Sequence, residues 1–276
     1  MSDHADTARN GSGRAMVWRH RNGQAPEAPE LDWVVQERPV ALEYNGVSHA
    51  TLLATPCDLE DLALGFSITE GIIRSATDLY DIELSETPQG YVVELTIASA
   101  CFAGLKQRRR TLAGRTGCGL CGLETLDDVL RPLPAVPAPI KPIEIESILR
   151  ALEQLWTRQP LHRQTGASHA AAWADLSGEV GQVREDVGRH NALDKLIGTL
   201  MNRRREHDSS AGFVVISSRA SFEMVQKAAA VGIPAVVAVS APTQYAIETA
   251  DRLGVMLVGF ARGRDFTVYT HPQHLA

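Results

Sequence analysis

The first half of the chain pairs short strand-like runs with one helical pattern. "VALEYNGVSHATLLATP" contains two such runs on either side of Asn45-Gly46, a dipeptide that tolerates the positive φ angles of a tight turn. This segment therefore predicts a β-hairpin. A second pair of strands is predicted at "LYDIEL" and "YVVELTIA", farther along the same half.

Between the two strand pairs, "CDLEDLALGFSITEGII" has the spacing of a helix. Its apolar residues recur at intervals of three and four, at Leu59, Leu62, Ala63 and Phe66. Asp58 is a candidate N-cap, and Gly71 lies where such a helix would end. We expect one helix here, packed against the hairpin.

The second half of the chain has a different pattern. "GFVVISS", "PAVVAVS" and "VMLVGFA" are short and almost uniformly apolar, as is typical of strands buried on both faces of a parallel sheet. Helical patterns at "SFEMVQKAAAVG" and "QYAIETADRLG" separate them, and amphipathic helices are predicted earlier, at "IEIESILRALEQLW" and "RHNALDKLIGTLM". The order of elements is βαβαβ, which predicts an α/β fold with a mostly parallel sheet.

Changes in composition divide the chain into four segments. Residues 1–30 show little apolar spacing and are predicted to form a disordered tail. Residues 31–130 form a smaller mixed α+β part that carries a cysteine loop. The proline-rich run "RPLPAVPAPIKP", residues 131–142, is predicted to be a linker. Residues 143–276 form the α/β domain.

The parallel sheet predicts where a ligand would bind. Right-handed crossovers bring the carboxyl ends of parallel strands to one edge, so "SSRAS", "SAPT" and "GFARGRD" should converge there. Ser217, Ser240, Arg219, Arg262 and Arg264 lie in these loops. Together with the N-termini of two helices, these side chains could bind phosphate groups. Loops with solvated arginines remain the alternative.

Charge and hydropathy exclude several classes of protein. The 276 residues are 44% hydrophobic and carry a formal net charge of −6, with mixed signs along the chain. A global basic field is therefore absent, so no nucleic acid partner is expected, although "KQRRR" and "NRRRE" are local positive patches. The first residues lack an apolar signal core, and no run approaches the roughly 18 apolar residues of a membrane span. We expect a soluble, cytoplasmic protein.

Two of the four cysteines form a C-x-x-C pair, Cys118 and Cys121, in the glycine-rich stretch "RTGCGLCGLE". A structural zinc site needs four ligands, and here Cys101 with one of three histidines would have to complete it, namely His162, His169 or His190. The zinc deaminase pattern is not matched, because no proline precedes Cys118. We expect no metal, and the flanking glycines indicate a flexible strap rather than a thioredoxin-like helix start.

A flexible cysteine suits the transfer of a sulfur atom. A thiolate is the nucleophilic form, and the nearby arginines, Arg115 and the run 108–110, would lower the pKa of Cys118. Because the neighbouring glycines have no side chains, a bulky donor and then a bulky acceptor could approach the same sulfur atom.

The polar block "REDVGRHNALDK" has two interpretations. Asp186 and Arg189 would serve only to begin a helix. Alternatively, Arg189, His190 and Asn191 would gather donors and acceptors at a helix start and bind a guanine edge or a phosphate.

Taken together, the motifs resemble those of the formate dehydrogenase accessory sulfurtransferases, the FdhD/NarQ family. The resemblance runs from about Pro39 to Pro272 and is carried by "TPCDLEDLALGFSITEGII", "RTGCGLCGLE", "TGASHAA", "REDVGRHNALDKLIG", "SSRASFEMVQKAAAVGIP", "SAPT" and "GFARGRDFTVYTHP". "TGASHAA" departs from the family pattern, since Ala167 stands where a second glycine is expected.

The resemblance implies a sulfur carrier that receives sulfur from a cysteine desulfurase as a cysteine persulfide. The sulfur would then pass to the bis-molybdopterin guanine dinucleotide molybdenum cofactor of formate dehydrogenase. Cys118 maps to the persulfide cysteine and Cys121 to an assisting thiol. The family's cofactor-binding stretch maps to "FARGRD", that is Phe260, Ala261, Arg262, Gly263, Arg264 and Asp265. GDP-like nucleotides would bind as fragments of the cofactor.

Two further expectations follow from the resemblance. The fold would be similar to that of cytidine deaminases, and the protein would be a homodimer. Two function classes remain open: a sulfurtransferase with a covalent persulfide on Cys118, and a non-catalytic chaperone that binds and shields the molybdenum cofactor.

Overall fold

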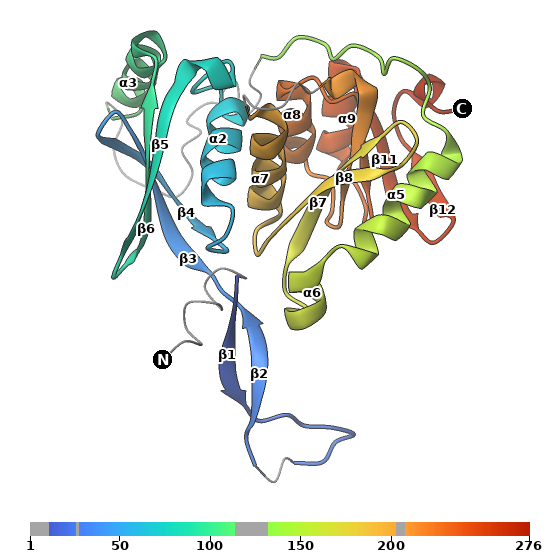
Figure 1. The fold of residues 1–276 in the computed structure, drawn as a ribbon. Coiled ribbons are helices and arrows are strands. Elements are labelled where there is room, and N and C mark those ends of the chain that lie inside the picture. Colours follow the sequence, from blue (N-terminus) through green and yellow to red (C-terminus); the bar gives the residue numbers. More distant parts are fainter. Residues whose placement is uncertain (1–10, 26–27, 114–131, 203–207) are drawn as a thin grey trace.

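The computed structural model describes residues 11–25, 28–113, 132–202 and 208–276, and the side chains of 108–113 are not described. The described chain forms two packed parts and a projecting ribbon (Figure 1). Cys118, Cys121 and Arg115 lie outside the described residues, as do residues 1–10 of the predicted tail.

The first part is a four-stranded sheet of order β4-β3-β6-β5. Its strands are β3 (Arg38–Tyr44), β4 (Val47–Ala54), β5 (Leu79–Thr87) and β6 (Gly90–Ile97). The predicted hairpin is confirmed: Asn45 and Gly46 join β3 to β4 with φ angles of 48° and 75°. The second strand pair is confirmed as well.

Two helices accompany this sheet. The predicted helix is α2 (Leu59–Thr69), whose apolar face packs on the sheet through Leu59, Leu62 and Ala63. Asp58 does not cap it through its side chain; its carboxylate lies 3.6 Å from Nε of Arg184 instead. The helix α3 (Ser99–Ala113) was not predicted, and "KQRRR" lies within it.

The second part is a six-stranded sheet of order β12-β11-β10-β9-β7-β8. Its strands are β7 (His169–Asp175), β8 (Val180–Asp186), β9 (Gly212–Ile216), β10 (Ala235–Ala238), β11 (Met256–Arg262) and β12 (Asp265–Val268). Only β9, β10 and β11 run parallel to one another. Because β7, β8 and β12 pair antiparallel, the sheet is mixed, and the prediction of a mostly parallel sheet holds only for its centre.

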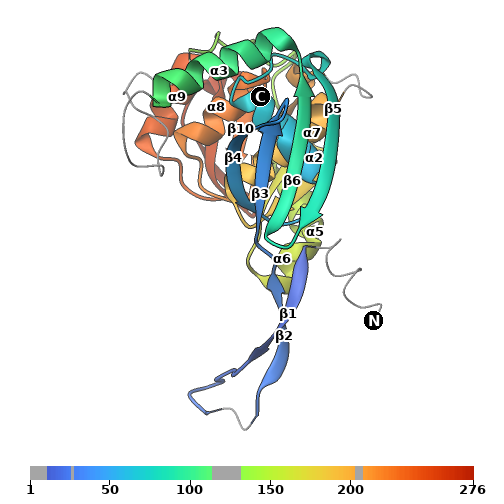
Figure 2. The same ribbon diagram turned by 90° about the vertical axis from the view of Figure 1, so that its left-hand side faces the viewer.

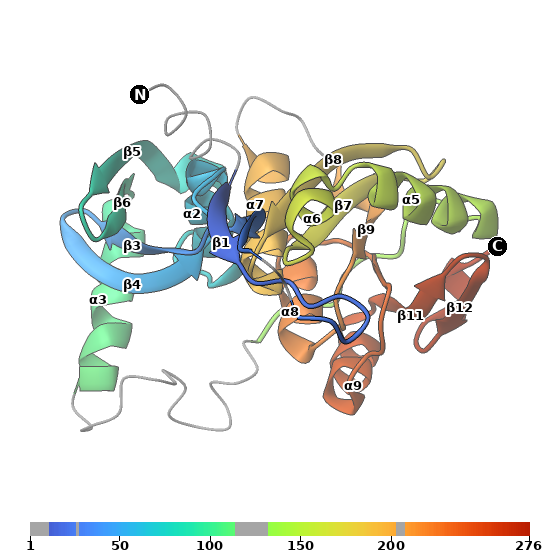
Figure 3. The same cartoon turned by 90° about the horizontal axis from the view of Figure 1, so that it is seen from below.

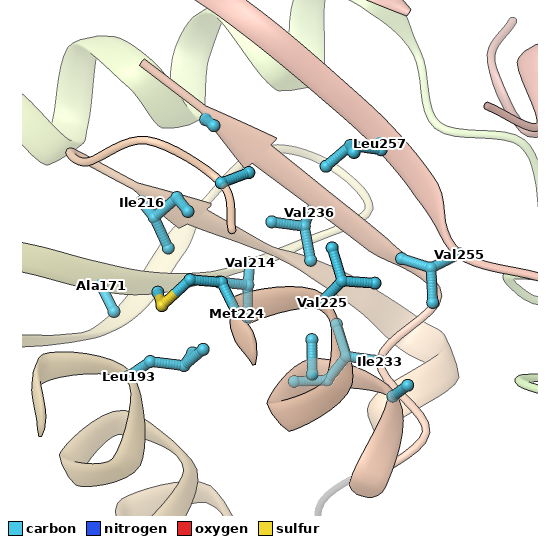
Figure 4. Packing of buried hydrophobic residues seen from close by; sticks show 14 of the residues in the cluster. Ala171, Leu193, Val214, Ile216, Met224, Val225, Ile233, Val236, Val255 and Leu257 are labelled. Atoms are coloured by element: carbon cyan, nitrogen blue, oxygen red, sulfur yellow. The ribbon is translucent and has the colours of Figure 1, made fainter. Parts of the chain in front are cut away.

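Helices cover both faces of this sheet, as its apolar strands predicted (Figure 1). On one face α7 (Arg189–Met201), α8 (Phe222–Ala230) and α9 (Gln244–Leu253) pack on Val214 and Ile216 of β9. Figure 4 shows this packing around Met224 and Leu193. On the other face α5 (Ile145–Thr157) packs on Phe213 and Val215, and the short α6 (Pro160–Thr165) follows it.

The proline-rich run from residue 132 onward does not behave as a free linker. Val136 is buried in the core beneath α7, α8 and α9, and its N–H donates to the carbonyl of Leu253 at 2.7 Å. The N–H of Ile140 donates to the carbonyl of Ser210. The prolines keep this segment extended, while these contacts hold it along the second part of the molecule.

The amino-terminal region also differs from the predicted tail. Ser12–Val17 form β1, which pairs antiparallel with β2 (Glu30–Val35). The two-stranded ribbon projects from the body of the molecule in Figures 1 and 2. Its base is fixed, because Gly11 and Ser12 are buried and the Cβ position of Gly11 lies against Thr55 and Leu161. The ribbon was not predicted because its composition, rich in Gly, Pro and charged residues, is also typical of a disordered tail.

The two parts meet where α2 lies against α7 (Figure 1). A Cβ atom on Gly65 would lie 1.8 Å from the carbonyl oxygen of Asp194, and one on Gly198 would lie 1.9 Å from that of Asp61. The backbones are therefore in contact through one glycine from each helix. Since α7 also packs on the sheet, it is buried on nearly all sides, including the polar residues Asp194, Lys195 and Thr199.

Replacement of Gly65 tests this contact. Gly65→Ala forces the helices apart, so we expect the free energy of unfolding in urea to fall by at least about 2 kcal/mol. Gly104→Ala is the matched control: it lies in α3 with open space around its Cβ position, and it should leave stability unchanged or raise it by up to about 1 kcal/mol. Equal effects of the two substitutions would contradict the close packing.

Candidate functional site

The carboxyl ends of the parallel strands converge, as predicted. Ala220 and Pro242 form a parallel bridge, and the N–H of Thr243 donates to the carbonyl of Ala220 at 3.0 Å. The N–H of Phe260 donates to the carbonyl of Ser240 at 3.1 Å. The loops that begin at residues 217, 240 and 259 therefore form one edge of the molecule, on the side from which Figure 3 is seen.

The "FARGRD" segment is the end of β11 and its turn into β12. Phe260 has a φ of 53° and leaves 49% of its surface exposed, while Ala261 is buried in the core. Backbone conformations with positive φ are strained for a bulky residue and are often found at functional sites. Gly263 supplies the positive φ of the turn, and Asp265 begins β12.

The two arginines of this segment differ in their surroundings. Nε of Arg262 donates to the carbonyl of Val239 at 3.0 Å, which holds its side chain along the strand ends. Arg264 pairs with Glu146 of α5 at 2.6 Å, and both side chains are highly exposed. Arg219 is also exposed at this edge. Arg262 is thus the arginine that the fold positions most firmly.

A pocket of about 320 Å³ opens at the same edge, between α6 and the end of β9. It is lined by Trp156, Gln159, His162, Gly166, Ala167, Ser168, His169 and Ser217. Ser217 was predicted at this edge, His162 and His169 were considered only as ligands of a zinc site that was not expected, and the other lining residues were not assigned to a site. The sequence does contain a signal for this pocket: two histidines, His162 and His169, lie on either side of Gly166 just before an apolar strand.

Glu185, at the end of β8, organises one wall of the pocket. Its carboxylate accepts hydrogen bonds from the N–H groups of Leu161 and His162, at 2.9 and 2.8 Å, and from the hydroxyl of Ser168 at 2.9 Å. These bonds satisfy the free donors at the start of α6. They fix α6 and the loop after it, and therefore the shape of the pocket.

Three groups give the pocket hydrogen-bond acceptors. Nδ1 of His162 lies 2.9 Å from the carbonyl of Ser168 and must donate to it, so Nε2 is an acceptor in the tautomer that carries its proton on Nδ1. Burial, together with the charge of Arg189, lowers the pKa of His169, so this ring is neutral near pH 7. The side chain of Gln159 is buried, and its Nε2 donates to the carbonyl of Leu155. Its Oε1 has no partner among the described residues.

The block "REDVGRHNALDK" lies where the two parts meet. Asp186 and Lys195 form a fully buried ion pair of 2.7 Å, and Nζ of Lys195 also donates to the carbonyl of Thr55. Nδ2 of Asn191 donates to the carbonyl of Leu53 at 2.8 Å and to Asp186 at 3.1 Å. The Asn191 amide thus donates to β4 and to the end of β8, and it does not face a ligand as a donor.

Arg189 and His190 lie closer to the candidate pocket. Their charges both act on the titration of His169, and Nε of Arg189 has no hydrogen-bond partner in the described part of the chain. Nε2 of His190 lies 2.8 Å from Glu223 of α8, and this contact lowers the pKa of Glu223. Of the three helix-start residues that were predicted, Arg189 is therefore the one with an uncommitted donor.

Two further ion-paired clusters cross the boundary between the parts. Lys227 of α8 contacts Asp194 and Glu70, both at 2.9 Å; burial alone would lower the pKa of Lys227, but these carboxylates raise it. Asp61 of α2 accepts from Arg184 at 2.8 Å and from Thr199 at 2.7 Å.

The remaining cysteines are not placed with the pocket residues. Cys101 lies on α3, and Cys57 lies 3.8 Å from Nζ of Lys195; burial raises the pKa of both thiols. Among the residues that the structure describes, no group of three or more His, Cys, Asp or Glu side chains could hold a metal ion. No helix in the described ranges is long and apolar enough to cross a membrane.

Comparison with known proteins indicates a family for this chain. The model of the FdhD/NarQ family matches residues 35–276. A "Sulfur carrier protein FdhD" of Bordetella petrii is 53% identical over 272 residues, covering 99% of this chain and 97% of that protein. A protein of the same name from Cupriavidus necator is 52% identical, covering 94% of this chain and 88% of that protein.

One solved structure has the same fold. It is the crystal structure of a putative formate dehydrogenase accessory protein from Desulfotalea psychrophila, which is 22% identical with a TM-score of 0.76 and covers 96% of this chain and 100% of that one. The resemblance that the motifs indicated is confirmed, and the chain belongs to the FdhD/NarQ family.

Proposed function

We propose that this chain is a sulfur carrier that takes up sulfur as a persulfide on Cys118 and delivers it to a molybdenum cofactor destined for formate dehydrogenase. The sulfur-carrier role is the one that the names of its relatives give, and these relatives share about half of its residues over nearly its full length. The observation that supports the chemistry is the C-x-x-C pair in the glycine-rich stretch "RTGCGLCGLE".

The transfer to Cys118 is a thiolate exchange. The Cys118 thiolate attacks the outer sulfur of a persulfide on a cysteine desulfurase; the S–S bond of the donor breaks, and the donor cysteine leaves as a thiolate. Cys118 then carries the extra sulfur. Cys121 would assist its release: its thiolate attacks Sγ of Cys118, a Cys118–Cys121 disulfide forms, and the outer sulfur leaves as hydrosulfide.

The acceptor is proposed to be the bis-molybdopterin guanine dinucleotide form of the cofactor, bound by its nucleotide at the edge described above. The pocket offers acceptors, namely Oε1 of Gln159, a ring nitrogen of His169 and, in the tautomer with its proton on Nδ1, Nε2 of His162. Guanine presents N–H donors at N1 and N2, so its edge complements these groups better than adenine does. Trp156, which is half exposed at the rim, offers a face on which a base can stack.

The phosphates would extend from the pocket along the converging strand ends. Ser217, Ser240 and Phe260 border that path, and Arg262, Arg189 and Arg219 supply positive charge. Arg264 would have to leave its exposed pair with Glu146 to take part.

Several finer expectations from the family resemblance remain proposals. The fold would be similar to that of cytidine deaminases, the protein would act in the cytoplasm, and it would form a homodimer. A cofactor-binding chaperone without persulfide chemistry is the alternative function, and the same pocket would serve it equally well.

Intact-mass analysis separates the two functions. After incubation with a cysteine desulfurase and cysteine, we expect the wild-type chain to gain the mass of one sulfur atom, and Cys118→Ala to gain none. Cys101→Ala is the control, because its thiol lies on α3 and its pKa is raised by burial and by nearby Asp78, so it should load normally. No added mass in the wild type, while a known acceptor loads in parallel, would support the chaperone.

Binding of guanine nucleotides tests the pocket. Gln159→Met keeps the volume of the side chain but removes Oε1, so the Kd for GDP measured by calorimetry should rise about tenfold. The preference for GDP over ADP should shrink by a similar factor. Gln273→Met is the matched control, since Gln273 is an exposed residue near the carboxyl end that bonds to His271.

The two experiments are independent. Loading of sulfur on Cys118 should be normal in Gln159→Met, because this residue binds the acceptor and not the donor. Unchanged GDP affinity in Gln159→Met would show that the base binds elsewhere. Normal GDP affinity in an Arg262→Ala, Arg264→Ala double variant would likewise show that the phosphates do not bind at the "FARGRD" turn.

A further inference from the structure

The projecting ribbon has two different faces. In its register Met16 stands opposite Leu31, and Arg14 stands opposite Trp33 on the same side. This side is largely apolar, and the one charged group on it, the guanidinium of Arg14, lies over the ring of Trp33, 4.5 Å from its centroid. Trp18 follows at the next position of the same alternation.

The other face carries the acidic residues of the ribbon. Asp32 and Glu30 lie on it, opposite Ala15 and Val17. Arg19 bonds to both carboxylates there. Polar groups on this face are therefore paired within the ribbon, and it is suited to face water.

The apolar face has no cover within the described residues. Met16 is 60% exposed, Trp18 62% and Leu31 60%. Figures 1 and 2 show that the ribbon stands away from both parts of the body in two perpendicular views. Three large apolar side chains exposed side by side are unusual on a surface that meets only water.

The partner that covers this face must remain bound most of the time. A single two-stranded ribbon is at best marginally stable in water, and it needs packing against another element to persist. A donor or acceptor that binds and leaves with each sulfur atom would expose the face again each time. A second copy of the same chain would cover it continuously.

The charge of the ribbon is compatible with a second copy. Residues 12–35 hold three arginines (14, 19 and 21) and three acidic residues (27, 30 and 32), so the ribbon is formally neutral while the whole chain carries −6. Two ribbons, or a ribbon and an acidic body, can therefore meet without net repulsion. A standard interface takes about 800 Å² from each partner, more than three partly exposed side chains provide, so adjoining surface must join in.

We infer that the apolar face of the β1–β2 ribbon, formed by Met16, Trp18, Leu31 and Trp33, is the contact through which two copies of this chain associate. The inference rests on the homodimer proposed above and adds the surface that forms it. The ribbon leaves the body beside α6, which it contacts through β2 (Figure 3). The dimer contact thus begins next to the helix that forms one wall of the candidate pocket.

Substitutions on the two faces of the ribbon test the inference. A charge placed on the apolar face would be buried without a partner, so Leu31→Lys should raise the dimer Kd at least about 30-fold, as loss of a dominant interface side chain does. Val34→Lys is the matched control: Val34 lies on the opposite face, opposite Gly13, and is 38% exposed. Analytical ultracentrifugation of the full chain over a range of concentrations measures the dimer Kd of each variant.

The expected result is a wild type and a Val34→Lys variant at twice the chain mass of 29.9 kDa, and Leu31→Lys at the single mass. Trp18→Ala adds no charge and should also weaken the dimer. This second variant keeps the test valid if Leu31→Lys disrupts the fold of the ribbon. GDP binding by each variant reports an intact body. A dimer unchanged in both Leu31→Lys and Trp18→Ala would overturn the inference while leaving the homodimer standing, and a monomeric wild type would overturn both.

Discussion

The buried ion pair between Asp186 and Lys195 is the contact on which the arrangement of the molecule depends. Both side chains are completely removed from solvent, and the pair is extended by bonds to Thr55 from each of its members. Thr55 follows β4 in the first part, whereas Asp186 and Lys195 belong to β8 and α7 in the second. A buried charge without its partner is strongly destabilising, so the pair commits the two parts to one relative position. The glycine contact between α2 and α7 then brings their backbones together.

The same strand end connects this boundary to the candidate pocket. Successive side chains of a strand point to opposite faces, and Glu185 and Asp186 are successive residues at the end of β8. Asp186 is held between the two parts, while Glu185 holds the start of α6 and the hydroxyl of Ser168 at the pocket wall. A shift of one part against the other would therefore reach the pocket directly. The charged block "REDVGRHNALDK" therefore serves both the boundary between the parts and the wall of the candidate pocket.

The sequence predicted those features that depend on local patterns. The hairpin at Asn45-Gly46, the helix α2, the three parallel strands and the meeting of their ends all follow from turn chemistry and hydrophobic periodicity. Two of the features that were not predicted depend on contacts between distant segments. The polar side chains of α7 are buried because their partners, Asp61, Thr69 and Lys227, come from elsewhere in the chain. The pocket was missed for the same reason: Gln159, His169 and Ser217 meet only after β7 pairs antiparallel with β9.

A double-mutant cycle on Asp186 and Lys195, followed by urea unfolding of the full chain, tests the central claim most directly. Lys195→Met should lower the free energy of unfolding by about 3–5 kcal/mol, because it leaves the Asp186 carboxylate buried and unpaired. Adding Asp186→Asn should recover part of this loss, with an interaction energy above about 2 kcal/mol. Single effects below about 1 kcal/mol that simply add together would contradict the account, because the two parts would then be held in place by other contacts.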